Sequence, residues 1–407
     1  MEFNPLSPEY RQDPFPILEQ LRDEAPVYEI PNYGLFALSR YADVLSALKQ
    51  PHTFSSAGMR AMMTGQTGMM GTGDSADNEM AEVDNLITTD PPVHDRLRNI
   101  VNRGFTPRQI AQLEPRVRAI ADELVDSIVA GGDMMDFVHD LTIPLPVRVI
   151  AEMLGVEPGR HREFKRWSDA LMTTSTGTGE VDDLAAVNAD RQALFDFLTE
   201  VVADRRKNPG DDLISTLIDG GPTGQALSDP EALTFSVLLL MAGNETTTNL
   251  LGNAMKALIA NPDTLRKVGE NPELIPPMLE EALRYDGPVQ SLFRQTSEDV
   301  ELDGGTIPAG RMVMLLMSSA NRDERQFDEA DRFDITRRTS GHLGFGFGVH
   351  FCLGASLARL EARVALEALF ERCTNLELEL PGVEDVEMFE SLVVRGPKAM
   401  PMSFRAT

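Results

Sequence analysis

Residues 229 to 260 constrain the fold of this 407-residue chain more than any other stretch. The segment Asp229-Pro230-Glu231 is a typical helix start, with a capping residue and a proline in the first turn. A helical pattern then continues to the Asn-Pro pair at 261–262. About 30 residues, at about 1.5 Å per residue, form a rod of roughly 45 Å, which is long enough to cross a whole domain. We therefore predict one long central helix.

The predicted long helix contains an isolated acid. Between Glu231 and Lys256 its only charged residue is Glu245, and three threonines follow at 246 to 248. A carboxylate in an otherwise uncharged helix is costly to bury, so it needs partners or a chemical purpose. The glycine at 243 and the threonines weaken the local helical hydrogen bonds and can open the helix. The pattern alone fits an ordinary helix irregularity and a functional groove equally well.

A second informative stretch, residues 344 to 361, has glycines at alternate positions, then a cysteine and a run of helix formers. The glycines make a turn whose backbone can lie close to a flat ligand. Cys352 stands at the start of the following helix, where the macrodipole favours thiolate over thiol. A thiolate shielded by Phe345, Phe347 and Phe351 suits an axial ligand of haem iron. The structural alternative is a buried free cysteine beside a glycine turn.

These residues carry a family resemblance. The spacing Phe-Gly-x-Gly-x-His-x-Cys-Leu-Gly is met without exception at 345–354, and it closely resembles the haem-binding loop of the cytochrome P450 family. Ala-Gly-x-Glu-Thr-Thr at 242–247 is similar to the family's oxygen-binding helix motif. The resemblance covers nearly the whole chain. It implies a mainly α fold with small β-sheets, in which residues 1–407 form a single large domain with a long central helix over the haem.

The resemblance also assigns roles to individual residues. It implies that Cys352 is the metal ligand of haem b (iron protoporphyrin IX), and that Glu245 and Thr246 are the catalytic pair that relays protons. The positions that it places against the haem or its propionates are His94, Arg98, Ala242, Gly243, Arg294, Phe345, Gly346, His350 and Gly354. Those that it places in the substrate pocket are Leu239, Val289, Leu292 and Val393.

A third motif of the family, Glu-x-x-Arg, is matched by Glu281 and Arg284. The i, i+3 spacing allows the two side chains to pair on one face of a short helix. Such a spacing alone is weak evidence, because chance matches are common on helices. We interpret the pair as structural, a buried ion-pair network that Arg332 joins.

Two segments are expected to be mobile regions that admit substrate, residues 57–89 and 169–182. The first is rich in glycine and methionine, and methionine side chains adapt to varied apolar shapes. A solvated loop without a function is an equally good interpretation of it. The second contains a Thr- and Gly-rich stretch at 173–179, which we expect to break two helical patterns.

Composition limits the partners and the location of the chain. The formal net charge of −27 argues against general affinity for nucleic acids or anionic membranes. Only two cysteines occur, Cys352 and Cys373, which indicates a reducing compartment and no disulfide framework. No apolar run approaches the about 20 residues that span a bilayer, and the N-terminus lacks a leader pattern. We expect a cytoplasmic monomer with no membrane or nucleic-acid partner.

The resemblance implies a bacterial-type haem-thiolate monooxygenase. It would hydroxylate or epoxidise a small apolar organic substrate with O2 and two electrons from a ferredoxin or flavodoxin and its NAD(P)H reductase. Arginines outnumber acids at residues 94–108 of this acidic chain. We therefore expect an acidic donor to dock on Arg96, Arg103 and Arg108, together with Arg359 and Arg363 on the helix after the cysteine.

Three alternatives remain open at this stage. They are a peroxide-driven hydroxylase of the same fold, a nitric-oxide-reducing relative and a non-enzymatic haem sensor or carrier. The first two are not expected to keep the acid that Glu245 supplies. The third would explain the cysteine loop but not a proton relay.

Overall fold

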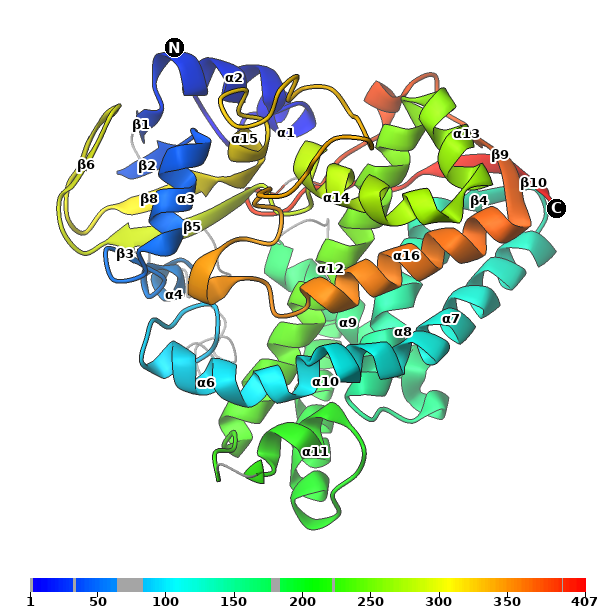
Figure 1. Cartoon of the computed structure of the whole chain (residues 1–407). Coiled ribbons are helices and arrows are strands. Elements are labelled where there is room, and N and C mark those ends of the chain that lie inside the picture. The colour runs from blue at the N-terminus through cyan, green and yellow to red at the C-terminus, as the bar shows by residue number, and fades with distance from the viewer. Residues whose placement is uncertain (1–2, 32–33, 64–82, 177–183, 222–223, 390) are drawn as a thin grey trace. The chain divides into compact units, whose positions relative to one another are not determined.

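The computed structural model describes residues 3–31, 34–63, 83–176, 184–221, 224–389 and 391–407 (Figure 1). The chain divides into two compact units, each of which is described by itself. The first unit comprises Met1–Ser55, Val117–Leu145 and Thr246–Thr407, and the second comprises Ser56–Arg116 and Pro146–Glu245. Much of the two expected access regions, residues 64–82 and 177–182, lies outside the described residues.

Helices dominate both units. Those of the first unit are α1 (Pro8–Gln12), α2 (Phe15–Glu24), α3 (Tyr41–Lys49), α13 (Pro262–Glu270), α14 (Ile275–Tyr285), α15 (Met317–Asn321) and α16 (Ala355–Arg372). Those of the second unit are α4 (Gly58–Met63), α6 (Val93–Val101), α9 (His161–Thr176), α10 (Leu184–Lys207) and α11 (Leu213–Ile218). Three helices contain residues of both units, α7 (Pro107–Ala130), α8 (Pro144–Met153) and α12 (Asp229–Ile259).

The predicted long helix is confirmed as α12, which has 31 residues. It begins in a capping box, because the Ser228 N–H donates to Glu231 Oε2 at 2.8 Å and the Glu231 N–H donates to Ser228 Oγ at 3.4 Å. At its other end the Asn261 side-chain amide donates to the Ala257 carbonyl at 2.9 Å. Both ends therefore satisfy backbone groups that a helix leaves without partners.

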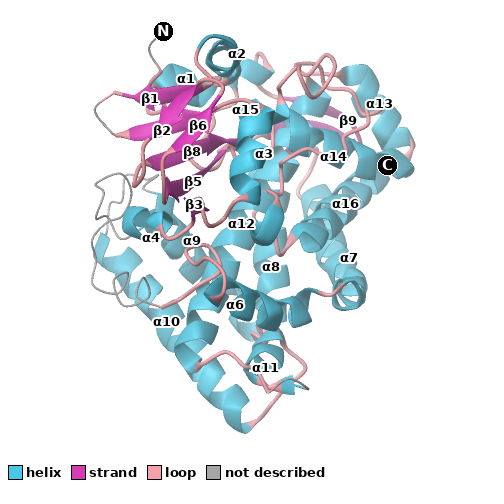
Figure 2. Cartoon of the chain, turned by 60° about the vertical axis from the view of Figure 1, so that its left-hand side comes forward, coloured by secondary structure: helices cyan, strands magenta, loops and turns pink. Residues whose placement is uncertain are grey.

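Among the described residues, five strands of the first unit form a sheet in the order β1-β2-β8-β5-β3 (Figure 2). Their bounds are β1 (Val27–Ile30), β2 (Leu35–Leu38), β8 (Met312–Leu316), β5 (Ser291–Thr296) and β3 (Phe54–Ser55). β2 pairs with β1 antiparallel and with β8 parallel, so it is an interior strand, and all four of its residues are buried. Phe36 and Leu38 pack with Val44 of α3 in one apolar cluster.

Smaller sheets complete the first unit. β4 (Met134–Asp136), β10 (Pro401–Ala406) and β9 (Cys373–Leu378) form one, while β6 (Val300–Leu302) and β7 (Gly305–Ile307) form a two-stranded ribbon. Cys373 is buried in β9, and burial raises the pKa of its thiol to about 11. It is thus a core thiol, as its sequence context indicates.

The ion pair expected between Glu281 and Arg284 is present and fully buried, with both side chains 0% exposed. Arg284 Nη2 donates to Glu281 Oε1 at 2.7 Å, and its Nε donates to Oε2 at 2.8 Å. The remaining guanidinium donors reach the backbone carbonyls of Asn321, Ala330 and Arg332. The pair therefore fixes a long loop that follows α15.

Arg332 does not join this network through its side chain, so that part of the prediction is wrong. Its guanidinium bonds the exposed Glu329 at 2.7 Å and Asp334 at 3.1 Å instead. Arg337 takes the expected place, with its Nε 3.4 Å from Glu281 Oε1. The Asp334 N–H also donates to that oxygen, at 2.9 Å.

The helix break expected at residues 173–179 is wrong for its first half, because α9 continues to Thr176. Threonine costs well under about 1 kcal/mol per residue in a helix relative to alanine, so tertiary packing overrides it easily. α9 packs along α10, and this contact stabilises its last turn as a helix. No described helix is long and apolar enough to span a bilayer.

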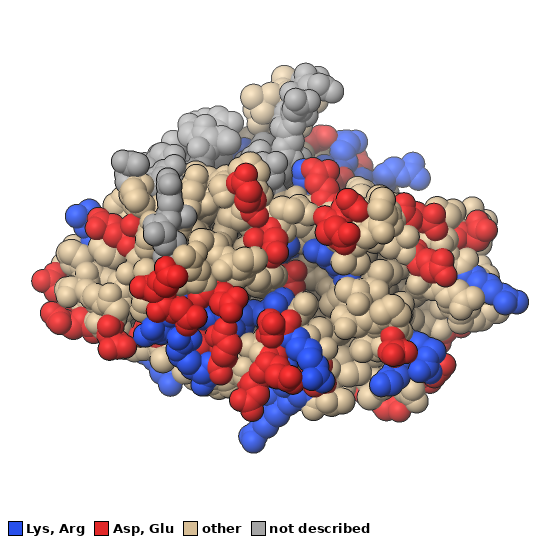
Figure 3. Space-filling model, turned by 90° about the horizontal axis from the view of Figure 1, so that it is seen from above, with Lys and Arg blue, Asp and Glu red and all other residues tan. Residues whose placement is uncertain are grey.

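Charged side chains of both signs are interleaved rather than separated. On the face in Figure 3, Lys and Arg lie beside Asp and Glu instead of forming one basic patch. In the first unit, for example, Arg22 is paired with Glu324 at 2.9 Å. No single-sign patch therefore dominates this face.

Candidate active site

A tight turn holds the cysteine loop, residues 344–354. Gly346 and Gly348 have φ angles of +71° and +73°, a region that favours glycine. A Cβ at Gly348 would lie 2.7 Å from a backbone carbonyl oxygen of α3, so a side chain does not fit there. The Cys352 N–H donates to the Phe345 carbonyl at 2.9 Å and closes the loop.

Cys352 lies two residues before Gly354, the cap of α16. It is half-buried and free of any disulfide. The positive end of α16 favours the thiolate form at this position. The expected shielding by aromatic rings is only partial, because Phe345 is half-buried whereas Phe347 and Phe351 are each 42% exposed.

One face of α12 stays accessible in the middle of a helix that is otherwise largely buried. Leu238, Glu245 and Thr246 are half-buried and Ala242 is exposed. Their spacing of three and four residues puts them on one stripe of the helix. Next to the stripe, Gly243 faces α8, and a Cβ there would lie 2.9 Å from the end of the Ile150 side chain.

Glu245 has the electrostatic property that a proton relay requires. Burial raises the pKa of its carboxyl group from 4.5 to about 7. Both the protonated and the ionised form are therefore populated near neutral pH. The neighbouring threonines differ in their environment, since Thr246 is half-buried, while Thr248 is buried and donates to the Thr142 carbonyl at 2.8 Å.

The candidate propionate ligands belong to two different units. In the second unit, His94 of α6 is 1% exposed, and its Nδ1 lies 3.3 Å from Asp95 Oδ1. Burial lowers the pKa of His94, an effect that Asp95 partly offsets, so its imidazole is neutral at pH 7. On the same helix, Arg98 Nε donates to Asn102 Oδ1 at 3.0 Å.

In the first unit, Arg294 of β5 is 4% exposed, and its Nη1 donates to the Phe293 carbonyl at 2.7 Å. His350 is half-buried and ends the short 3₁₀ turn Gly348–His350 in the cysteine loop. A buried guanidinium bonds carboxylates best, often with two parallel hydrogen bonds. Within the first unit, the cationic Arg294, the loop residue His350 and the position of Cys352 are of the kinds that suit a haem.

The expected pocket residues are apolar and partly accessible. The structure brings Val289 and Val393 together in the first unit, because the Gln290 N–H donates to the Val393 carbonyl at 2.8 Å. Leu292 is half-buried, as are both valines. Leu239 lies on α12 in the second unit and is 9% exposed.

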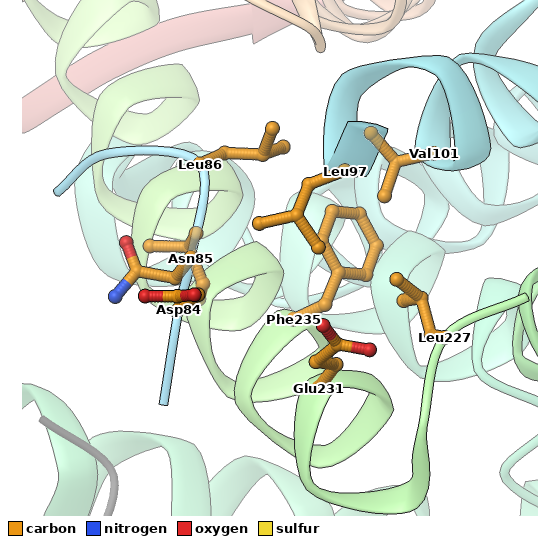
Figure 4. A pocket seen from close by; sticks show the side chains of 9 residues that line it. Asp84, Asn85, Leu86, Leu97, Val101, Leu227, Glu231 and Phe235 are labelled. Carbon is orange, nitrogen blue, oxygen red and sulfur yellow. The ribbon is translucent and has the colours of Figure 1, made fainter. Parts of the chain in front are cut away.

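A separate small cavity lies in the second unit (Figure 4). Its lining residues are Asp84, Asn85, Leu86, Leu97, Val101, Leu227, Glu231, Phe235 and Leu238. Its volume of about 10 Å³ is room for about one water molecule, so it is not a substrate site. Arg96 closes this region with an ion pair to Glu231.

Two of the arginines expected to dock an electron donor have partners within the second unit. Arg96 is paired with Glu231, and Arg103 donates to the Ile100 carbonyl at 3.1 Å. Arg108, by contrast, is exposed and has no hydrogen-bond or ion-pair partner among the described residues. No sequence pattern indicated the Arg96 pairing, because Glu231 lies 135 residues away along the chain.

Comparison with known proteins identifies the class. The sequence model of the cytochrome P450 family matches residues 67–275 and 272–403, and the chain belongs to this family. The vitamin D(3) 25-hydroxylase of Pseudonocardia autotrophica is 40% identical over 396 residues, which cover 96% of this chain and 94% of that protein. The cyclomarin C epoxidase CymV of Salinispora arenicola is 38% identical over 390 residues, or 95% of each protein.

A solved structure agrees with this. Cytochrome P450 CYP109Q5 from Chondromyces apiculatus aligns with a TM-score of 0.90 at 39% identity, covering 100% of this chain and 99% of that chain. The predictions of a mainly α P450 fold and of a haem cofactor are confirmed. The chain is a haem-thiolate monooxygenase that uses O2, an organic substrate and a redox partner.

Proposed function

We propose that this monooxygenase inserts one oxygen atom into an apolar organic substrate, with Cys352 as the haem ligand and Glu245 and Thr246 as the proton path. The observation that carries the proposal is the Glu245–Thr246 pair on the accessible stripe of α12. The names of the relatives refer to vitamin D(3) and to cyclomarin C, which supports an organic substrate. Half-buried Val289, Leu292 and Val393 supply apolar walls.

When bound, haem supplies a thiolate-ligated iron that activates O2 and favours O–O cleavage. His94, Arg98, Arg294 and His350 would hold its propionates through charged or polar hydrogen bonds. The carboxyl group of Glu245, with its pKa raised by burial to about 7, takes up a proton and releases it again near neutral pH. The hydroxyl of Thr246, on the next residue, relays a proton by accepting one hydrogen bond while it donates another.

We expect Thr246→Ala to uncouple the enzyme. The loss of the hydroxyl leaves haem binding, substrate affinity and first-electron transfer nearly intact, because none of them needs this proton. Product formed per NAD(P)H consumed should fall, and hydrogen peroxide released should rise. Both are measured in one turnover assay, with a substrate that has no hydroxyl near the oxidised carbon.

Two further variants make this test specific. Thr247→Ala changes the adjacent residue, which is 3% exposed, and should keep the parent coupling ratio. Glu245→Gln should slow turnover by about 10²-fold, raise the solvent isotope effect and remove an inflection of the rate near pH 7. An unchanged coupling ratio in Thr246→Ala would show that this hydroxyl serves only the helix.

We also propose that the electron donor is an acidic ferredoxin or flavodoxin that docks at Arg108. Arg108 is exposed in the first turn of α7, where a cation opposes the helix macrodipole. Helix stability therefore does not explain an arginine there, whereas attraction to an acidic surface does. The expected cytoplasmic location, monomeric state and single-domain behaviour stay predictions.

Charge reversal tests the donor site. Arg108→Glu should slow reduction by the donor at low salt and flatten its dependence on ionic strength. Arg405→Glu, at another exposed arginine in β10, makes the same change in net charge and is the matched control. If both variants slow reduction equally, overall charge rather than Arg108 governs docking.

A further inference from the structure

A carboxylate that no motif singles out connects two helices of the first unit. Glu280 of α14 accepts two hydrogen bonds from Arg359 of α16, Nε to Oε1 at 2.6 Å and Nη2 to Oε2 at 2.9 Å. His342 adds a third contact, with its Nε2 3.1 Å from Glu280 Oε2. This Glu280 network, made of Glu280, Arg359 and His342, is separate from the ion pair of the Glu-x-x-Arg motif.

Both partners of Glu280 contact the cysteine loop. The guanidinium of Arg359 lies over the Phe345 ring, 4.4 Å from its centroid, and the Phe345 carbonyl accepts the Cys352 N–H. His342 Nδ1 accepts the Gly344 N–H at 3.1 Å, which leaves the imidazole proton on Nε2, facing Glu280. The network therefore holds the cysteine loop at two points, Gly344 at its start and Phe345, which bonds Cys352.

The network carries a balanced charge. Burial acts to raise the pKa of Glu280, but hydrogen bonds from Arg359 and His342 outweigh it and hold the pKa at about 2. Glu280 is thus ionised near neutral pH, and it neutralises the guanidinium that stacks on the loop. The side chains of Arg359 and Glu280 are 37% and 28% exposed, so water screens the pair only in part.

The same ion pair lines a surface cleft of about 420 Å³ between α14 and α16. Pro276, Pro277 and Arg363 are among its other lining residues. Arg363 pairs with Glu367 on its own helix, at 2.9 Å, whereas Arg359 pairs with Glu280 of α14. Arg363 therefore serves as a control for Arg359, because both arginines line the same cleft.

We propose that Glu280 is a positioning residue for the haem ligand, which orients the cysteine loop through Arg359 and His342 and sets the charge beside the thiolate. The inference rests on the proposed role of Cys352 as that ligand. Residues that surround a metal ligand orient it and tune the metal, although they do not touch the metal themselves. The reduction potential of the bound haem is then the property that Glu280 controls.

The sign of the effect follows from charge. Reduction adds one negative charge to the ligated haem, so nearby positive charge favours the reduced form. Glu280→Gln keeps the shape of the side chain but leaves the charge of Arg359 uncompensated, and the potential should shift upward. Arg359→Gln leaves Glu280 uncompensated, and the potential should shift downward.

The test is a potentiometric titration of the haem-loaded variants. The two single variants should shift in opposite directions, and the double variant Glu280→Gln/Arg359→Gln should return close to the parent. Arg363→Gln, which removes an equal charge from the same cleft, should shift less than Arg359→Gln. Transfer of haem to an apoprotein acceptor should be faster from Glu280→Gln than from the parent, because the loop is held less firmly.

The outcomes separate this inference from the proposed function. A parent enzyme without the red-shifted Soret band of a reduced carbon monoxide complex would refute Cys352 as the thiolate ligand. A parent that shows this band, with single variants that shift in the same direction or not at all, would refute the role of Glu280 alone. Equal shifts in Arg363→Gln and Arg359→Gln would refute it as well, because pairing with Glu280 would then be irrelevant.

Discussion

Cys352→His is expected to abolish the red-shifted Soret band of the reduced carbon monoxide complex and to reduce monooxygenase activity to background. That band depends on thiolate ligation, and an imidazole does not push electron density onto the iron in the same way. Cys352 lies just before the positive end of α16, which favours the thiolate over the thiol. Spectra of the reduced variant with carbon monoxide measure the change directly.

The chain supplies its own matched control for this experiment. Cys373 is 1% exposed in β9, and its pKa of about 11, raised by burial, keeps it a thiol. Cys373→Ser should therefore retain the band, with at most a loss of stability from the changed core. If Cys373→Ser removed the band and Cys352→His kept it, the ligand assignment would be reversed.

Local patterns explain which parts of the fold were predictable. α12 was correct almost to the residue, because its start, its body with Glu245 as the single charge and the Asn-Pro end all lie within one stretch of sequence. The two strands β1 and β2 are likewise close together along the chain, and they pair antiparallel. The break expected at residues 173–179 was wrong for residues 173–176, since packing between α9 and α10 outweighs the weak preferences of threonine.

Partners that are distant in sequence explain most of the rest. Arg96 was expected to face a protein partner, yet it is paired with Glu231, 135 residues away. The ion pair between Glu280 and Arg359 was not predicted, because the two residues are 79 positions apart. Glu280 also stands next to Glu281, to which the Glu-x-x-Arg motif already assigns a role. The spacing of apolar residues indicates which face of a helix is buried, but it does not indicate which distant residue pairs with a charge on that helix.

Glu281→Gln is expected to lower the free energy of unfolding by about 3–5 kcal/mol, because it leaves a buried arginine without its counter-charge. Both Glu281 and Arg284 are 0% exposed, so water does not compensate for the lost charge. Natural domains are stable by only about 5–15 kcal/mol, and the variant should therefore lose much of its haem-loaded protein at 37 °C. Denaturant unfolding and the ratio of haem to protein measure the two effects.

An exposed pair with the same i, i+3 spacing is the matched control. Glu329 and Arg332 lie in the loop that Arg284 fixes, and their side chains are 68% and 58% exposed. Glu329→Gln should cost less than about 1 kcal/mol, because solvent replaces the lost interaction. Where Glu281→Gln yields too little folded protein, Arg337→Gln gives a milder test, since Arg337 reaches Glu281 at 3.4 Å. Equal stability losses in Glu281→Gln and Glu329→Gln would mean that burial of the motif pair contributes nothing to the fold.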